Sequence, residues 1–202
     1  MSDQTSLRIA GWIFAIAFFV GLILVGDQAG AFADSESAYT AIFSDSAHRT
    51  EDIAGSILLI VSAIAFGAFA YLLALRNDTG AAPVVVRVAG GLAAASMLVA
   101  GAAFLTVPAS LALGDFYGDP GIVSAQNVLP SLGYVLLVIG AAIPAATLMV
   151  ASTRLGQYPA WLTWVSVITA VLLVVTGSSV STMVLLPIWV AVVVFVTPRP
   201  TT

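Results

Sequence analysis

The sequence predicts an all-α protein, a polytopic transmembrane helical bundle of six spans that forms a single membrane domain over residues 1–202. Hydrophobic residues make up 60% of the chain and charged residues only 8%, against about 45–50% and about 25% in ordinary soluble proteins. The apolar residues also fall into separate runs, each near the roughly 20 residues that a helix needs to cross a bilayer. A soluble protein with this composition could not cover its surface with polar residues. The composition therefore excludes a soluble enzyme, a disordered protein and a nucleic-acid-binding protein.

The first four spans are bounded by charged residues or by helix breakers. The first apolar run ends before Asp27, and the second lies between Asp52 and Arg76. The third follows Pro83, and the fourth ends before Arg154. These limits predict spans over residues 9–26, 53–75, 85–108 and 128–151, with one long outer loop over residues 27–52.

The start of the chain also has features of a secretory signal peptide. An apolar run is followed by Ala31-Phe32-Ala33, which has the small-residue pattern of a cleavage site. The apolar run has 17 residues, however, and signal peptides carry about 7–15. We therefore expect the segment to be retained as the first span, with cleavage as the alternative.

The last part of the chain predicts two short spans. From Pro159 to Val196 the sequence has 38 residues without a formal charge, a run of about 57 Å as a straight helix and too long for one span. The turn-forming residues Thr176-Gly177-Ser178-Ser179 divide it. The predicted spans are residues 160–176 and 180–196. A five-span arrangement, with the last pair partly re-entrant, is the alternative.

The arginines indicate the orientation of these spans. With both termini in the cytoplasm, five of the six arginines face inward and only Arg49 faces outward. Eight of the ten acidic residues then face outward. This is the bias of the positive-inside rule, and it predicts a multi-pass plasma-membrane protein with cytoplasmic N- and C-termini.

Several kinds of chemistry are excluded by composition. The chain has no cysteine and one histidine, His48, which excludes disulfides, thiolate metal sites, iron–sulfur clusters and haem held between two protein histidines. It has no phosphate-binding glycine loop, H-E-x-x-H motif or nucleophile elbow, so we expect no cofactor, no catalytic residues and no enzyme activity. No charged residue falls in the middle of a span, which argues against a carboxylate-based proton carrier and a voltage sensor.

One polar cluster is compatible with a metal ion. If the second helix begins early, Asp45, His48 and Asp52 follow one another at i, i+3 and i+7, and an imidazole with two carboxylates can bind zinc. The simpler interpretation is a first helical turn with acids near its positive end and Arg49 paired to one of them.

In the preceding residues 35–43, apolar side chains at helical spacing predict a short helix packed on the outer ends of the spans.

Small residues and prolines within the spans predict how the helices pack. The third span is small on nearly every side, so we expect it to lie centrally and to use its small residues for packing, with oligomerisation as the alternative. Its packing candidates are Gly90, Gly91, Ala94 and Ala95. Pro144 and Pro187 fall inside the fourth and sixth spans and are hinge candidates, although kinks are common in membrane helices.

Two small polar residues share a face of the fifth span. Ser166 and Thr169 are separated by three residues, and we expect them to bond to their own helix or to join two helices.

The residues before and within the second span resemble those of a known group of membrane proteins. Phe43-Ser44-Asp45 and His48-Arg49 stand before a Gly/Ala-rich span that ends in Leu75-Arg76. In this respect about the first 80 residues resemble uncharacterised small multi-pass membrane proteins of actinobacteria. The resemblance implies no activity.

The expected function follows mainly from what is excluded. We expect an integral plasma-membrane protein without catalytic chemistry, acting as an accessory or interaction component. Its expected partners are the lipid bilayer and either another membrane protein or a second copy of itself. The alternative is a small transporter or channel with an acidic outer rim.

Overall fold

The computed structural model describes residues 3–26, 45–76, 79–114, 120–156, 158–176 and 180–196. These residues are helical or connect helices, and none of them forms a strand. The first three helices are α1 (Asp3–Leu24), α4 (Ser46–Ala74) and α5 (Ala82–Leu113). The next three elements follow one another without a loop: α6 (Pro120–Val135), the π-helical turn η2 (Leu136–Ala141) and α7 (Ala142–Ser152).

The chain ends in shorter elements. A 3-10 turn, η3 (Thr153–Leu155), leads toward α8 (Ala160–Val175). The last two helices are α9 (Val180–Met183) and α10 (Leu185–Val196). Most helix limits lie within about six residues of the predicted span limits. The two larger differences are at helix starts: α4 begins at Ser46, inside the predicted outer loop, and α6 begins at Pro120, eight residues before the predicted fourth span.

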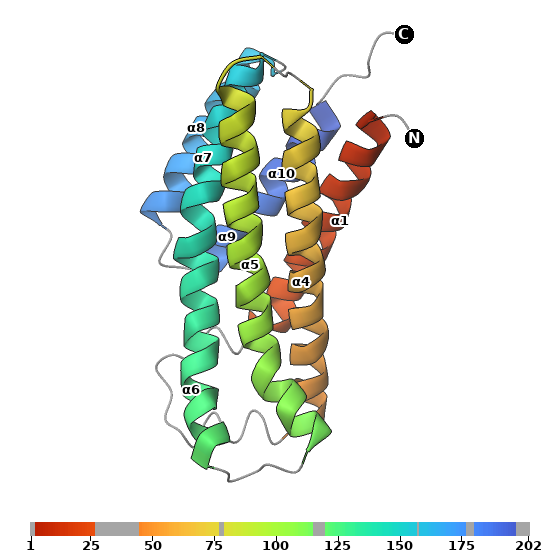
Figure 1. Ribbon diagram of the computed structural model, residues 1–202, viewed down its shortest axis with the longest axis vertical. Coiled ribbons are helices and arrows are strands. Elements are labelled where there is room, and N and C mark those ends of the chain that lie inside the picture. Colours follow the sequence, from red (N-terminus) through yellow and green to blue (C-terminus); the bar gives the residue numbers. More distant parts are fainter. Residues whose placement is uncertain are drawn as a thin grey trace.

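The long helices lie side by side in an elongated bundle (Figure 1). Helix α4 packs between α1 and α5, and α5 packs against the continuous rod of α6, η2 and α7. Helix α8 packs on α7, and α10 packs on both α8 and α1. The bundle is thereby closed into a ring at the end that carries both termini (Figure 1).

In the part of the chain that the structure describes, four helices are long and apolar enough to cross a membrane: Gln4–Leu24, Ser46–Ala74, Ala82–Leu113 and Val128–Leu155. Helices α8 and α10 have only 16 and 12 residues, which is about 24 Å and 18 Å of helix against about 30 Å of hydrocarbon. In Figure 1 the elements α8, α9 and α10 lie in the half of the bundle nearer the termini. The structure confirms a helical bundle but does not confirm six full spans.

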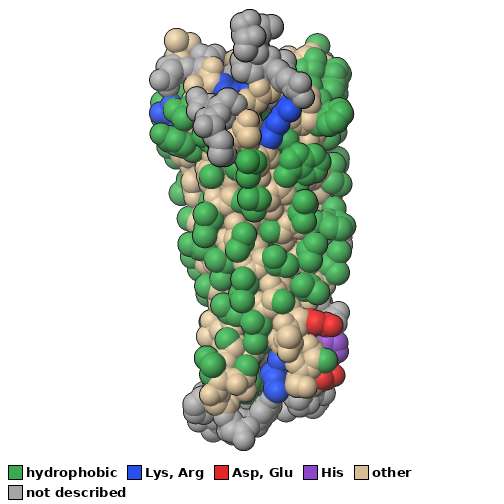
Figure 2. Space-filling view, turned by 90° about the vertical axis from the view of Figure 1, so that its right-hand side faces the viewer, with side chains coloured by type: hydrophobic (Ala, Val, Ile, Leu, Met, Phe, Trp, Pro, Cys, Tyr) green, Lys and Arg blue, Asp and Glu red, His purple; other side chains and the backbone are tan. Residues whose placement is uncertain are grey.

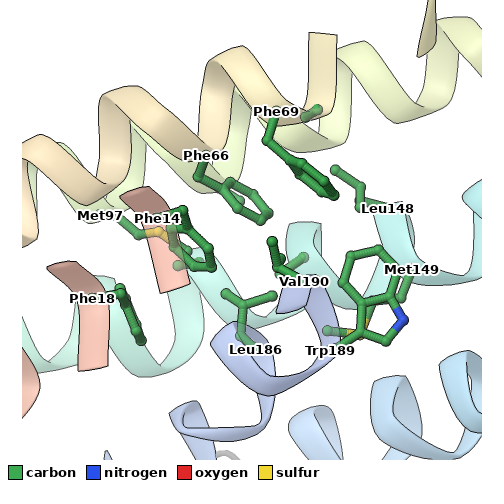
Figure 3. Packing of buried hydrophobic residues seen from close by; sticks show 14 of the residues in the cluster. Phe14, Phe18, Phe66, Phe69, Met97, Leu148, Met149, Leu186, Trp189 and Val190 are labelled. Carbon is green, nitrogen blue, oxygen red and sulfur yellow. The ribbon is translucent and has the colours of Figure 1, made fainter. Parts of the chain in front are cut away.

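The core of this half is built from aromatic and aliphatic side chains of several helices (Figure 3). Phe14 of α1, Phe66 and Phe69 of α4 and Trp189 of α10 are at most 2% exposed. The rings of Phe14 and Phe66 lie 4.8 Å apart, and Phe69 and Trp189 meet edge to face at 6.4 Å. Such aromatic pairs add stabilisation beyond buried area, so one face of α10 is fixed against α1 and α4.

The small residues of α5 have different surroundings. Gly90 is buried, and a Cβ added there would overlap Ala70 of α4 and lie 3.0 Å from Leu148 of α7. Gly91 is exposed and has nothing within 4 Å of a Cβ. Ala94 is half-buried, near Gly67 of α4, whereas Ala95 is exposed. Gly90 and Ala94 thus face neighbouring helices, and Gly91 and Ala95 face outward.

The two hinge candidates each follow an irregular stretch of backbone. Proline has no N–H, and its ring crowds the carbonyl four residues earlier. For Pro144 that carbonyl belongs to Gly140, inside the π-helical turn η2. For Pro187 it belongs to Met183, the last residue of α9, after which Val184 separates α9 from α10.

Candidate functional site

The charged side chains mark the two ends of the bundle, and the surface between them is hydrophobic (Figure 2). Helices α1 and α5 begin, and α4 and α7 end, at the end of the bundle nearer the termini (Figure 1). We call this the arginine end because four arginines lie there: Arg8, Arg76, Arg87 and Arg154. The described charges at the opposite end belong to the start of α4: Asp45, Arg49, Glu51 and Asp52.

Two tyrosines lie beside the arginines of this end. The guanidinium of Arg87 stands 5.8 Å from the ring centre of Tyr71, a cation–π distance. Burial of the Tyr158 hydroxyl raises its pKa to about 12, although the neighbouring Ser152 hydroxyl and the charge of Arg76 act in the opposite direction. Burial lowers the pKa of Arg76, which Tyr158 raises and Arg8 lowers. The Tyr158 phenol is therefore held neutral beside a cation.

An open groove of about 710 Å³ runs between α5, α7 and α8. Its walls are almost entirely aliphatic, including Val85 of α5, Ile143 and Val150 of α7 and Val174 of α8. Arg154 lines the groove at the arginine end and is exposed. The groove thus combines an apolar wall along the bundle with one cation at its end.

A second groove offers a comparison within the same molecule. It lies between α1 and α4 and has a volume of about 450 Å³. Its lining residues include Ile9, Val61 and Ala68, and none of those that line it is charged. Only the first of these two grooves therefore has a cation in its wall.

One buried hydrogen bond joins the two arms of the short hairpin formed by α8, α9 and α10. The indole N–H of Trp189 donates to the Ser166 hydroxyl oxygen at 2.9 Å, and that hydroxyl donates to the Leu162 carbonyl at 2.8 Å. Ser166 is fully buried. The sequence predicted that Ser166 would bond either to its own helix or to a second helix, and in the structure its hydroxyl makes both kinds of hydrogen bond.

The structure does not bring the candidate metal ligands together. Asp45 caps α4 by accepting from the Ala47 N–H at 2.8 Å, and Asp52 is buried further along the helix. His48 lies 3.7 Å from Glu51 instead. Among the described residues, no group of three His, Cys, Asp or Glu side chains could hold a metal ion. A single helix does not bring the outer two candidates together, because Asp45 and Asp52 are seven residues apart, which is about 10 Å along the helix axis.

Two features of the half of the bundle nearer the termini were not predicted from the sequence. The groove depends on how far α8 stands from α5, which no sequence pattern reports. The partner of Ser166 was also missed, although a tryptophan in the next apolar helix was a usable signal, since a buried indole N–H needs an acceptor. The short helix predicted over residues 35–43 lies outside the described residues.

In comparisons with protein-family models, curated proteins and solved structures, no match to this chain was found.

Proposed function

We propose that the chain is an integral plasma-membrane protein that acts as an accessory or interaction component and carries no catalytic chemistry. One observation supports this best: the described charges stand at the two ends of a bundle whose interior is filled with apolar side chains. A catalyst or an ion carrier needs polar groups at its reacting or binding centre. Of the buried polar side chains that the structure describes, Ser62, Ser152 and Ser166 donate to carbonyls of their own helices. Gln4, Asp52 and Ser56 are also buried, near the starts of α1 and α4.

The packing of the core makes a transporter or channel the weaker proposal. Phe14, Phe66 and Met97 are at most 1% exposed, so water does not reach them. A transport path through this part of the bundle would require several large side chains to move together. Pro144 and Pro187 supply irregular backbone for such movement, which keeps transport as the second candidate function.

The charge distribution supports an orientation with the arginine end in the cytoplasm. Helix lengths support four full spans and a hairpin of α8, α9 and α10 that enters and leaves at this end. The hairpin replaces the last two of six spans and keeps both termini on the cytoplasmic side. Like the five-span alternative, this arrangement has a re-entrant final pair of helices. It differs from that alternative in having four full spans.

The proposal is tested by photocrosslinking in native membranes. A photoreactive amino acid is placed at three exposed positions on different faces: Ile64 on α4, Leu92 on α5 and Trp164 on α8. An interaction component gives a discrete product, with a defined protein or a second copy, from one face, while the other faces react with lipid. Solute flux through proteoliposomes of the pure protein, with no protein product from any face, would instead support the transporter.

A further inference from the structure

We infer that the groove between α5, α7 and α8 binds one anionic phospholipid, with its phosphate at Arg154 and an acyl chain along the aliphatic wall. The inference goes beyond the proposed function. It requires a membrane protein but no protein partner, so the two can fail separately.

The dimensions of the groove fit an acyl chain. Along α7 and η3 the lining runs from Ile143 to Arg154, positions that are eleven residues apart, or about 16 Å of helix. Half of the hydrocarbon core of a bilayer is about 15 Å. A chain anchored at the arginine end would therefore reach the middle of the membrane while remaining in contact with Val150 and Val174.

The charge at the groove end fits a phosphate. Arg154 is exposed, and its planar guanidinium can form two hydrogen bonds with phosphate oxygens. The lining next to it includes Ala81 and Ala82 at the start of α5, where no side chain caps the helix, so the positive end of that helix adds to the attraction. Basic pockets between helices at the cytoplasmic face are a known way of binding anionic headgroups.

No other described side chain that lines the groove is charged, so Arg154 is the group in the lining that would bind a phosphate. The Thr147 hydroxyl donates to the Ile143 carbonyl of its own helix at 2.9 Å. The groove between α1 and α4 has apolar walls without a charged residue, and it is expected to take lipid chains without preference for the headgroup. The contrast between the two grooves supplies the controls.

The test uses the purified full chain in dodecyl maltoside. Phosphatidylglycerol or phosphatidylcholine is added, and bound lipids are counted by native mass spectrometry. Arg154→Gln should weaken phosphatidylglycerol binding about tenfold, the loss of one charge-assisted interaction, and should not change phosphatidylcholine binding. Arg76→Gln removes the same charge at the same end outside the groove lining and should leave binding unchanged.

A second pair of variants tests the apolar wall. Val150 in this groove and Val61 in the other groove are both 40% exposed. Val150→Phe should fill the groove and reduce phosphatidylglycerol binding, whereas Val61→Phe should not. Arg154→Lys, which keeps the charge, should retain more binding than Arg154→Gln and so separates lost charge from lost folding.

Three results would overturn the inference. Equal loss in Arg154→Gln and Arg76→Gln would mean diffuse attraction to the arginine end. Unchanged binding in Val150→Phe would place the lipid elsewhere. Competition by soluble glycerol phosphate at the lipid's concentration would show that the site takes a free phosphate ester and not a phospholipid.

Discussion

Neighbouring residues on one helix turn can have opposite structural roles, as Gly90 and Gly91 show. A Cβ at Gly90 would overlap the Cβ of Ala70, which has no flexible end that could move away, whereas one at Gly91 would meet nothing within 4 Å. Gly90→Ala should therefore lower the free energy of unfolding by about 1–3 kcal/mol through overpacking. Gly91→Ala should be neutral or stabilising by up to about 1 kcal/mol, because alanine favours the helix.

Thermal unfolding in detergent, followed by circular dichroism, measures both variants. The pair is matched in chemistry and in depth along the bundle. If Gly91→Ala destabilised the protein as much as Gly90→Ala, the packing of α5 against α4 would be placed on the wrong face.

A second effect at the residue scale is the titration of Tyr158. Its pKa is raised from 10.0 to about 12, chiefly by burial. A group whose pKa is raised on folding stabilises the fold fully below its ordinary pKa and loses that contribution as pH rises. The stability that Tyr158 contributes should therefore decline between pH 10 and about pH 12.

Absorbance at 295 nm follows the ionisation of tyrosine. The wild-type protein should show a late step with an apparent pKa of about 12 that Tyr158→Phe lacks. The variant should also lose stability less steeply over this pH range. Identical alkaline titrations of the two proteins would contradict the burial of this hydroxyl.

At the scale of elements, the hairpin of α8, α9 and α10 is joined by the bond from Trp189 to Ser166. Interhelical hydrogen bonds in membrane proteins contribute on average about 0.6 kcal/mol and at most about 1.7 kcal/mol. Trp189→Phe and Ser166→Ala should each destabilise the protein. Their double variant should show a coupling energy of about 0.6 kcal/mol.

Denaturant unfolding of the four proteins in the cycle gives the coupling. Trp164, also on α8, is 69% exposed, and Trp164→Phe should change little. Strict additivity of Trp189→Phe and Ser166→Ala would mean that the bond contributes nothing to the stability of the hairpin.

The depth of this hairpin is a separate prediction. Thr176 directly follows α8 as its C-cap and is exposed. If the hairpin turns inside the membrane, a spin label on Thr176→Cys should be accessible to oxygen dissolved in lipid and shielded from a water-soluble nickel chelate. With six full spans the chelate would reach the label from the outer side.

At the scale of the whole molecule, the orientation can be tested with single cysteines, because the chain has none of its own. Ser37→Cys should react with a membrane-impermeant thiol reagent in intact cells. Asn77→Cys and Thr201→Cys should react only after the membrane is opened. The reverse pattern at positions 37 and 77 would invert the orientation, and an exposed Thr201→Cys alone would contradict the hairpin.

Helix positions were largely predictable because they follow from local composition. Long apolar runs can bury their backbone polar groups in lipid only as helices, and charged residues and glycine limit each run. The same reasoning placed α1, α4, α5 and the rod of α6 and α7 with small errors at their ends. It placed the starts of α4 and α6 seven and eight residues after their actual starts at Ser46 and Pro120, because a helix can extend beyond the apolar run that predicts it.

The site was less predictable because it depends on distances between helices. Asp45, His48 and Asp52 share a sequence pattern with metal sites, but one helix cannot bring the first and last of them together. The groove at Arg154 has no sequence pattern, since its residues come from three helices and are ordinary in each.

By itself, the sequence determined the fold class, the limits of the apolar helices and the separation of charges along the chain. These follow from the cost of placing polar groups in hydrocarbon, which acts on each segment separately. Only the tertiary structure decided that one face of α10 packs on α1 and on Phe69 of α4, that Gly90 and not Gly91 meets a neighbour, and that Arg154 ends an apolar groove. Lipid is as apolar as the side chains, so burial alone does not choose helix partners; close packing and a few hydrogen bonds do.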